Sequence, residues 1–179
     1  MVHGEFLERS RYYLADEYPA KIRLSLNAVD EAAIWARSSP DSNTIGNLMM
    51  HLAGNIRQWI VSGVGNSAGN RDRAGEFSAT DGASKNELLS LLEGTARDAD
   101  EVLASLAESD MSRRVTIQGR ETTVLAAIYH VVEHFAMHTG QIILLAKAAA
   151  PGTLKFYDDR GGNAVPLWGG TEGLRQPER

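Results

Sequence analysis

The amino-acid sequence predicts an all-α protein built as a four-helix bundle. Its 179 residues fit one domain that is large enough to bury its own core. Four long segments carry apolar residues at the spacing of an amphipathic helix, and polar or glycine-rich loops separate these segments. Amphipathic helices bury their apolar faces against one another, so a bundle is the expected architecture.

The first helix is expected from Gly4 to about Arg37. Pro19 should kink or split it, because proline removes a backbone donor and crowds the preceding turn. Residues 38–43 form the following loop, in which the side chain of Ser42 or Asn43 could cap the second helix.

Two connections separate the remaining three helices: one is long and glycine-rich, and the other is short and extended. The second helix is expected at about 44–61, and the glycine-rich stretch 62–75 then reads as a long flexible connection. A capping-box pattern, SKNE, opens the third helix, which should run from residue 84 to about 108. Residues 113–119 form a short extended piece with a turn, and the fourth helix covers about 122–149.

A Gly/Pro-rich C-terminal tail follows the last helix. We therefore divide the chain into a bundle, residues 1–150, and a tail, residues 151–179. The tail carries the aromatic residues Phe156, Tyr157 and Trp168, which favour packing on the bundle.

Composition and charge exclude several classes of protein. Acidic residues outnumber basic residues 23 to 18, for a formal charge of -5, which argues against nucleic acid as a partner. The chain has no cysteine, so disulfides, thiolate-metal sites and cysteine nucleophiles are excluded. The first residues are polar and charged, and no apolar run is long enough to span a membrane. A cytoplasmic location is expected.

Three of the five histidines stand four residues apart in the fourth helix, at His130, His134 and His138. With about 100° of turn per residue, His134 and His138 fall at roughly 0° and 40°, beside an apolar stripe centred near 70°. His130 falls at about -40°, and Glu133 points to water. Adjacent histidines can share a metal ion, whereas the outer two are too far apart. Orientation therefore selects His134 and His138, with Gln141 as a hydrogen-bonding neighbour on the same side.

A metal site needs at least one more protein ligand, and only His3 and His51 remain among the histidines. His51 lies at the polar border of the second helix, near Asn55, where a surface histidine would fit equally well. The alternative that each histidine only satisfies a hydrogen bond stays open. A zinc peptidase is excluded, because the residue that follows His134 is Phe135 and not the glutamate that acts as general base.

Among the charged residues in or after the glycine-rich stretch are Arg71, Arg73 and Glu76. They could hold an anionic substrate, but a solvated surface cluster is the favoured interpretation.

Two stretches resemble the hallmark segments of the DinB-like, or YfiT-like, superfamily: SNTIGNLMMHLAGNIRQWI at 42–60 and IYHVVEHFAMHTGQIILL at 128–145. The resemblance implies a four-helix bundle of up-down-down-up type, commonly dimeric, that holds a divalent metal on three side chains. Carried over residue by residue, these ligands are His51, His134 and His138. His130 matches a position that is often histidine but is not usually a ligand. Together with Asn55 and Gln141, it is a candidate neighbour of the site.

Some members of this superfamily are S-transferases or isomerases that use a low-molecular-weight bacterial thiol. The resemblance therefore implies such an activity on a small-molecule substrate, with zinc, nickel or ferrous iron as the metal. A hydrolase that uses metal-activated water and a non-catalytic bundle with a structural metal are the alternatives. No catalytic residue is identified. A homodimer is expected, and Trp35 and Met49 could form its shared surface.

Overall fold

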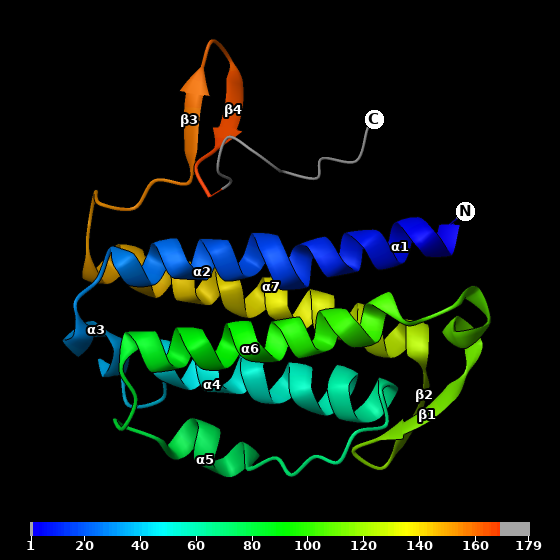
Figure 1. The fold of residues 1–179 in the computed structure, drawn as a ribbon. Helices are drawn as coiled ribbons and strands as arrows, with labels where there is room; N and C mark the ends of the chain where they lie inside the picture. Colours follow the sequence, from blue (N-terminus) through cyan, green and yellow to red (C-terminus); the bar gives the residue numbers. More distant parts are fainter. Residues whose placement is uncertain (1, 169–179) are drawn as a thin grey trace.

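The computed structural model describes residues 2–168, which are mostly helical, as the sequence predicts. Long helical segments lie side by side and form the body of the molecule (Figure 1). Two of these segments contain a π-helical part, named η1 and η2. The elements of the bundle are α1 (Val2–Arg11), η1 (Tyr12–Glu17), α2 (Tyr18–Asn27), α4 (Ile45–Ile56), η2 (Arg57–Val64), α6 (Lys85–Ala104) and α7 (Val124–Ala149).

The first helical segment is shorter than the sequence predicts. It ends at Asn27 and not near Arg37, and a separate short helix, α3 (Glu31–Trp35), follows. The break occurs because the carboxylate of Asp30 caps the first turn of α3 and so starts a new helix. Pro19 causes no break, since it lies in the first turn of α2, directly after η1.

The second helical segment begins at a different cap from the one predicted. Thr44, and neither Ser42 nor Asn43, precedes α4 and forms a capping box with Asn47. The Asn47 N–H donates to the Thr44 hydroxyl over 3.0 Å, and the Thr44 N–H donates to the Asn47 side-chain oxygen over 3.1 Å. The hydroxyl of Ser42 is bonded within its own loop, so it is not available to α4.

The glycine-rich stretch is not a wholly irregular connection, because it leads into a short helix, α5 (Arg73–Ser78), capped by Asp72. The buried side-chain amide of Asn47 donates to the carbonyls of Glu76 and Ala79, at 2.9 and 2.8 Å. These two bonds fasten α5 over α4, and Figure 1 shows the two helices as neighbours.

The third helix begins where the sequence predicts, but it ends at Ala104 and not near residue 108. Ser84 and Glu87 form the predicted capping box of α6. The turn predicted at Gly119, where φ is +74°, joins two antiparallel strands, and Thr123 then caps α7. The connection consists of the 3-10 turn η3 (Glu108–Ser112) and the strands β1 (Arg114–Ile117) and β2 (Arg120–Thr123).

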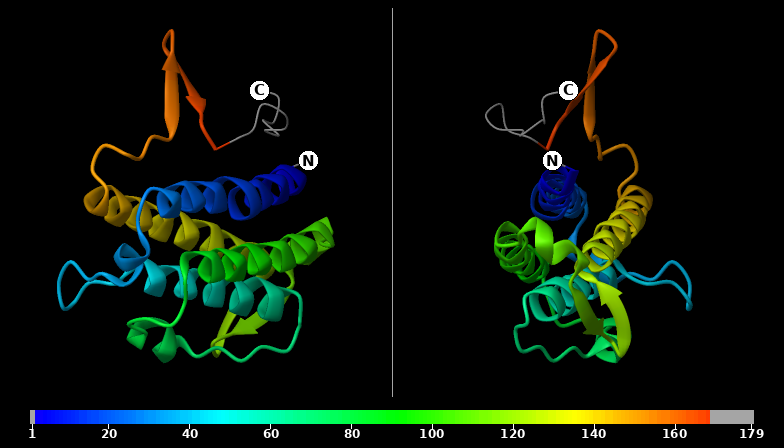
Figure 2. Two further views of the ribbon diagram at one scale, coloured as in Figure 1. Left: turned by 60° about the vertical axis from the view of Figure 1, so that its left-hand side comes forward. Right: turned by 90° about the vertical axis from the view of Figure 1, so that its right-hand side faces the viewer.

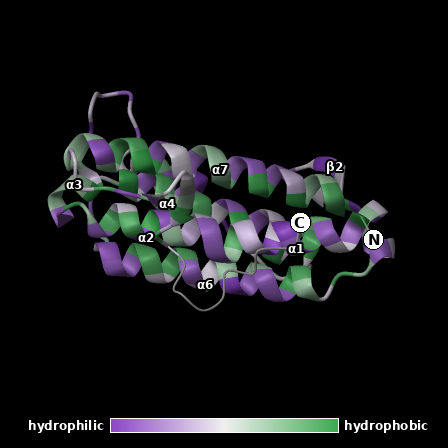
Figure 3. Ribbon diagram, turned by 90° about the horizontal axis from the view of Figure 1, so that it is seen from above, coloured by the Kyte–Doolittle hydropathy of each residue, from purple (hydrophilic) through white to green (hydrophobic). Residues whose placement is uncertain are grey.

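The core lies between the helices, and Figure 3 shows that each long helix carries both apolar and polar residues. The largest fully buried side chains include Leu14, Ile22, Leu26, Ile56, Leu88 and Phe135. No helix among residues 2–168 is both long enough and apolar enough to cross a membrane.

The tail contains a hairpin of β3 (Tyr157–Arg160) and β4 (Asn163–Pro166), which rises away from the bundle in Figures 1 and 2. At its base the ammonium group of Lys21 lies 4.4 Å from the centroid of the Trp168 ring. Residues 169–179 of the predicted tail lie outside the described residues. The division into a bundle and a tail that packs on it stays a prediction.

Trp35 and Met49 do not together form the exposed surface proposed for a dimer. Met49 is fully buried. The ring of Trp35 packs against Gly46, where an added Cβ would lie 2.6 Å from the ring, and its indole N–H donates to the carbonyl of Ala83 over 3.0 Å. The placement of the interface on Met49 is therefore wrong, and the ring and N–H group of the half-buried Trp35 already have contacts within the chain.

Candidate metal centre

Three histidines from two neighbouring helices meet inside the bundle: His51 of α4, and His134 and His138 of α7. One ring nitrogen from each lies within 4.8 Å of the others. The Nε2 atoms of His51 and His134 are 2.9 Å apart, and the ring centroids of His134 and His138 are 4.4 Å apart. Three imidazole nitrogens this close together could bind one metal ion.

The orientation of α7 agrees with its helical periodicity. His138 is buried and His134 is half-buried, whereas Glu133 is exposed. His130 is also half-buried, but it lies beside the group: its ring packs at a tilt against that of Trp59, with 4.3 Å between the ring centroids.

His51 is buried, with only 3% of its surface exposed, although the sequence places it on a polar border of its helix. The reason is α5, which covers that border. Glu76 and Phe77 of α5 both contact the histidine: the Glu76 Oε2 atom lies 2.9 Å from His51 Nδ1, and the Phe77 ring centroid lies 4.6 Å from that of His51. The interpretation of His51 as a surface histidine is therefore wrong.

Arg71 and Glu76 form a buried ion pair behind His51, so the prediction of a solvated surface cluster is wrong for these two residues. Arg73 is exposed, as predicted. Arg71 Nε and Nη2 donate to the two carboxylate oxygens over 2.6 and 2.7 Å, and Nη1 donates to Gln58 over 2.9 Å. Burial by itself would raise the pKa of Glu76, but hydrogen bonds from Arg71 and His51 outweigh it and hold the pKa below its ordinary value. The carboxylate is therefore an anion that touches the candidate ligand. In the sequence, this carboxylate belongs to the segment RDRAGEF at 71–77, in which an aspartate that can cap a helix precedes the glutamate by four residues.

Gly54 of α4 provides the room for this carboxylate. A Cβ at position 54 would collide with Glu76 Oε1 and would lie 3.0 Å from Arg71 Nε. A residue with a side chain at this point would displace the ion pair from His51.

Hydrogen bonds fix the orientation of two of the three imidazoles. The Nδ1–H group of His51 donates to Glu76, and the Nδ1–H group of His138 donates to Gln141 Oε1 over 2.6 Å. Arg71 Nη2 also lies 3.0 Å from His51 Nδ1, but a guanidinium only donates, so the carboxylate is the partner that accepts the proton. With the protons on Nδ1, the Nε2 atoms of His51 and His138 are left with free lone pairs.

The environment keeps His134 and His138, the two candidate ligands on α7, neutral. Burial, together with the neighbouring His138 and His51, lowers the pKa of His134 to about 3. Burial also lowers the pKa values of His138 and His130 below their ordinary value. A neutral imidazole is the form that binds a metal ion, so His134 and His138 are in their binding form at pH 7.

The other two candidate neighbours have different surroundings. Gln141 contacts His138, as the sequence analysis proposes. Asn55 is buried, and its side-chain oxygen has no hydrogen-bond partner within residues 2–168. The role of His51, His134 and His138 as metal ligands stays a prediction.

A family described as proteins of unknown function, DUF1572, matches residues 2–156. The chain belongs to this family. Its fold is similar to that of a DinB-like protein, YjoA, from Bacillus subtilis, with 16% identity and a TM-score of 0.62, over 85% of this chain and 99% of the other. A conserved protein from Enterococcus faecalis is similar at 15% identity and a TM-score of 0.62, over 83% and 95% of the two chains.

At these identities the two structures establish the fold alone. The shared fold and the DUF1572 family support the resemblance to DinB-like proteins that the histidine segments indicate. A comparison with proteins of curated function finds no match.

Proposed function

We propose that this DUF1572 protein binds one divalent transition metal through His51, His134 and His138. With that metal it acts as a thiol S-transferase or isomerase on a small molecule. The observation that supports the proposal is the convergence of three imidazoles, two of them oriented with Nε2 free. An all-nitrogen donor set suits zinc, nickel or ferrous iron.

The short distance between His51 and His134 bears on whether the three histidines fit a cation. Their Nε2 atoms are 2.9 Å apart, and two lone pairs at that distance repel each other unless a proton or a cation lies between them. Glu76 holds the His51 proton on the opposite ring nitrogen. Either His134 donates an Nε2 proton to His51, or both nitrogens bind a metal ion, and metal titration separates the two.

The residues around the group have definable tasks in this proposal. Glu76 and Gln141 fix the rings of His51 and His138, and Arg71 compensates the charge of Glu76 inside the protein. A divalent ion on three neutral ligands keeps its full charge, so it would lower the pKa of a bound thiol or water and supply a nucleophile near neutral pH. The chain has no cysteine, so the thiol has to come from a small molecule.

An exchangeable position on the metal favours catalysis over a structural role. Within residues 2–168, the group of close histidine and acidic side chains that could hold an ion has three members. Glu76 points its carboxylate at Nδ1 of His51, and Arg71 engages both of its oxygens. A structural zinc site has four protein ligands, and three leave room for a thiol or water.

The experiment that tests the thiol activity uses cobalt in place of the native metal. Small thiols added to the cobalt-loaded protein should produce an intense near-ultraviolet charge-transfer band, because a thiolate then binds the ion. His134→Ala should abolish this band and His130→Ala should retain it. If no thiol changes the spectrum while the loaded protein hydrolyses simple esters or amides, metal-activated water is the better mechanism.

The proposal includes a homodimer, although Trp35 and Met49 do not together form its surface. Four large apolar residues are exposed within about 120° of one another on α7, and exposed apolar patches mark interaction surfaces. They are Leu125, Tyr129, Met137 and Leu144. We propose that a second copy covers this face. The up-down-down-up helix order and the cytoplasmic location also stay predictions.

A further inference from the structure

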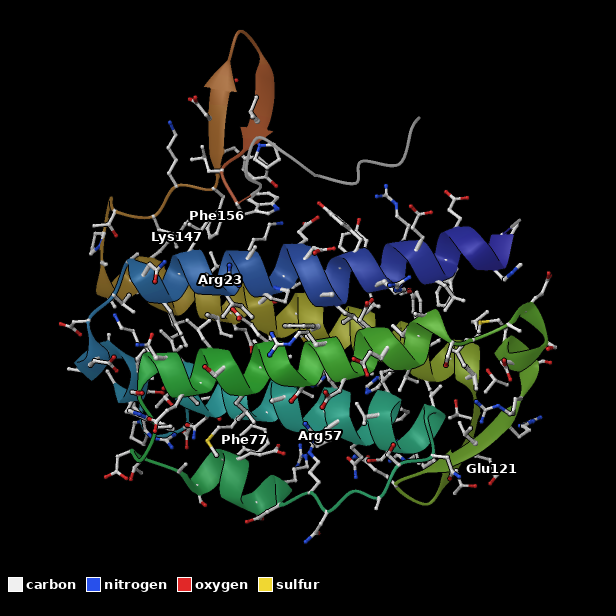
Figure 4. All side chains as sticks on the ribbon, viewed as in Figure 1. Arg23, Arg57, Phe77, Glu121, Lys147 and Phe156 are labelled. Atoms are coloured by element: carbon white, nitrogen blue, oxygen red, sulfur yellow. The ribbon has the colours of Figure 1, made fainter. Side chains whose placement is uncertain are left out.

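A cavity of about 220 Å³ lies between α4, α6 and the connection that leads into α5. Figure 4 labels Arg57, one of its lining residues, between α4 and this connection. None of the three histidines lines the cavity, but Arg71 and Glu76 do. The Arg71–Glu76 ion pair therefore contacts His51 and also lines this cavity, which is separate from the histidine group.

The size and lining of the cavity suit a compact apolar molecule. Met50, Ala53 and Leu91 contribute apolar surface, and Leu91 is 45% exposed, so the lining reaches the solvent. A buried apolar cavity of about 150 Å³ is enough to bind benzene. The present cavity has room for a molecule moderately larger than benzene.

The charges of the lining are already paired. Arg71 is bonded to Glu76 at 2.6 Å, and Arg57 is bonded to Asp98 at 3.0 Å. The carboxylate of Asp72, a further lining residue, caps α5. A charged ligand would lose its hydration without gaining an unpaired counterion, so an uncharged ligand is favoured.

One polar group of the lining has no partner. The buried hydroxyl of Ser62 makes no hydrogen bond to any described residue, whereas the hydroxyl of Thr95 donates to the carbonyl of Leu91 over 2.9 Å. Buried polar groups in folded proteins are nearly always bonded, so the Ser62 hydroxyl calls for a partner. Gly69, another lining residue, lies against this hydroxyl, so a ligand in the cavity reaches it by displacing Gly69.

We propose that this cavity is a second ligand site, for an uncharged molecule slightly larger than benzene that carries one hydrogen-bonding group for Ser62. A ligand bound there contacts the Arg71–Glu76 pair and so changes the metal affinity of the histidine group. The effect on metal affinity rests on the proposed metal function, whereas the ligand site itself does not. By linkage, metal bound at the histidines changes the ligand affinity by the same factor.

The first experiment uses metal-free protein in the presence of a chelator, with indole as the probe. Two-dimensional amide NMR should show saturable shifts at Ser62 and at the neighbouring lining residues. 1-Methylindole lacks the N–H donor and should bind the unaltered protein about three- to tenfold more weakly than indole does. The Ser62→Ala variant should bind indole more weakly by the same factor, because each change removes one hydrogen bond. Indole-3-carboxylate should bind more weakly than indole, because of its charge.

Filling the cavity gives the second variant. Ala53→Leu should abolish the indole shifts, whereas Leu125→Ala, on the exposed side of α7, should leave them unchanged. No saturable binding of indole by the metal-free protein, or binding that Ala53→Leu and Ser62→Ala both leave intact, overturns the ligand site.

The link to the metal is measured separately, by competition of zinc with a coloured chelator. Saturating indole should change the zinc dissociation constant at least threefold in the unaltered protein and not in Ala53→Leu. Indole binding without any change in zinc affinity overturns the link. Failure of zinc to bind at all contradicts the metal function and leaves the indole result to decide the cavity.

Discussion

Replacing Gly54 by alanine tests whether the Arg71–Glu76 pair is held as the structure describes it. Alanine is a better helix former than glycine, so by propensity alone the change should stabilise the protein by about 1 kcal/mol. In the structure, however, the new Cβ collides with Glu76 Oε1 and lies 2.9 Å from Glu76 Cδ. The carboxylate has to move, which breaks its bonds to Arg71 and His51.

The size of the effect follows from these bonds. A hydrogen bond to a charged group contributes about 1.5–3 kcal/mol. If two of the three bonds are lost without replacement, the net destabilisation, less the helix gain, is about 2–5 kcal/mol. Loss of the carboxylate that orients His51 should also weaken zinc binding about 10- to 100-fold.

Urea denaturation in the presence of a chelator measures the stability term without any contribution from metal. The matched control is Gly140→Ala on the exposed face of α7, where an added Cβ meets nothing within 4 Å. The control should stabilise the protein by about 0.5–1 kcal/mol. If Gly54→Ala is as stable as Gly140→Ala and binds zinc normally, Glu76 does not occupy the position described here.

Two further predictions concern pH and assembly. Because the pKa of His134 falls from 6.5 to about 3 in the folded protein, the unfolded chain binds this proton first as the pH falls. The metal-free protein should therefore lose stability between pH 6.5 and 3, and an unchanged urea midpoint between pH 7 and pH 5 would contradict the burial of this group. Tyr129→Glu and Leu144→Glu, which place charges on the exposed face of α7, should each turn a dimer into a monomer in light scattering. If the unaltered protein is already a monomer at micromolar concentration, the proposed dimer is wrong.

Periodicity was enough to predict the helical class and the orientation of the last helix. The 100° turn placed His138 near the core stripe and Glu133 in water, as they are in the structure, because α7 is long and its buried face is continuous. The bounds of the first helix were harder to predict. Asp30 starts a new helix within a segment whose apolar residues keep a helical spacing.

The environment of His51 could not be predicted from the periodicity of its own helix. That periodicity placed it on a polar border, but the border is covered by α5, a helix of six residues after a glycine-rich stretch. So short a helix has no amphipathic pattern of its own, and the bonds of Asn47 to its carbonyls hold it in place. The contacts of Glu76 and Arg71 with His51 depend on this packing. Local sequence patterns therefore could not predict them.

The central claim is that three histidines form one metal site, and metal stoichiometry in single variants tests it most directly. Purified protein should bind about one equivalent of zinc, measured by mass spectrometry of the metal after dialysis. His51→Ala, His134→Ala and His138→Ala should each remove most of it. His130→Ala, which alters a neighbouring histidine outside the group, should retain it. Zinc lost in His130→Ala but kept in His138→Ala, or no zinc bound by the unaltered protein, would contradict the account.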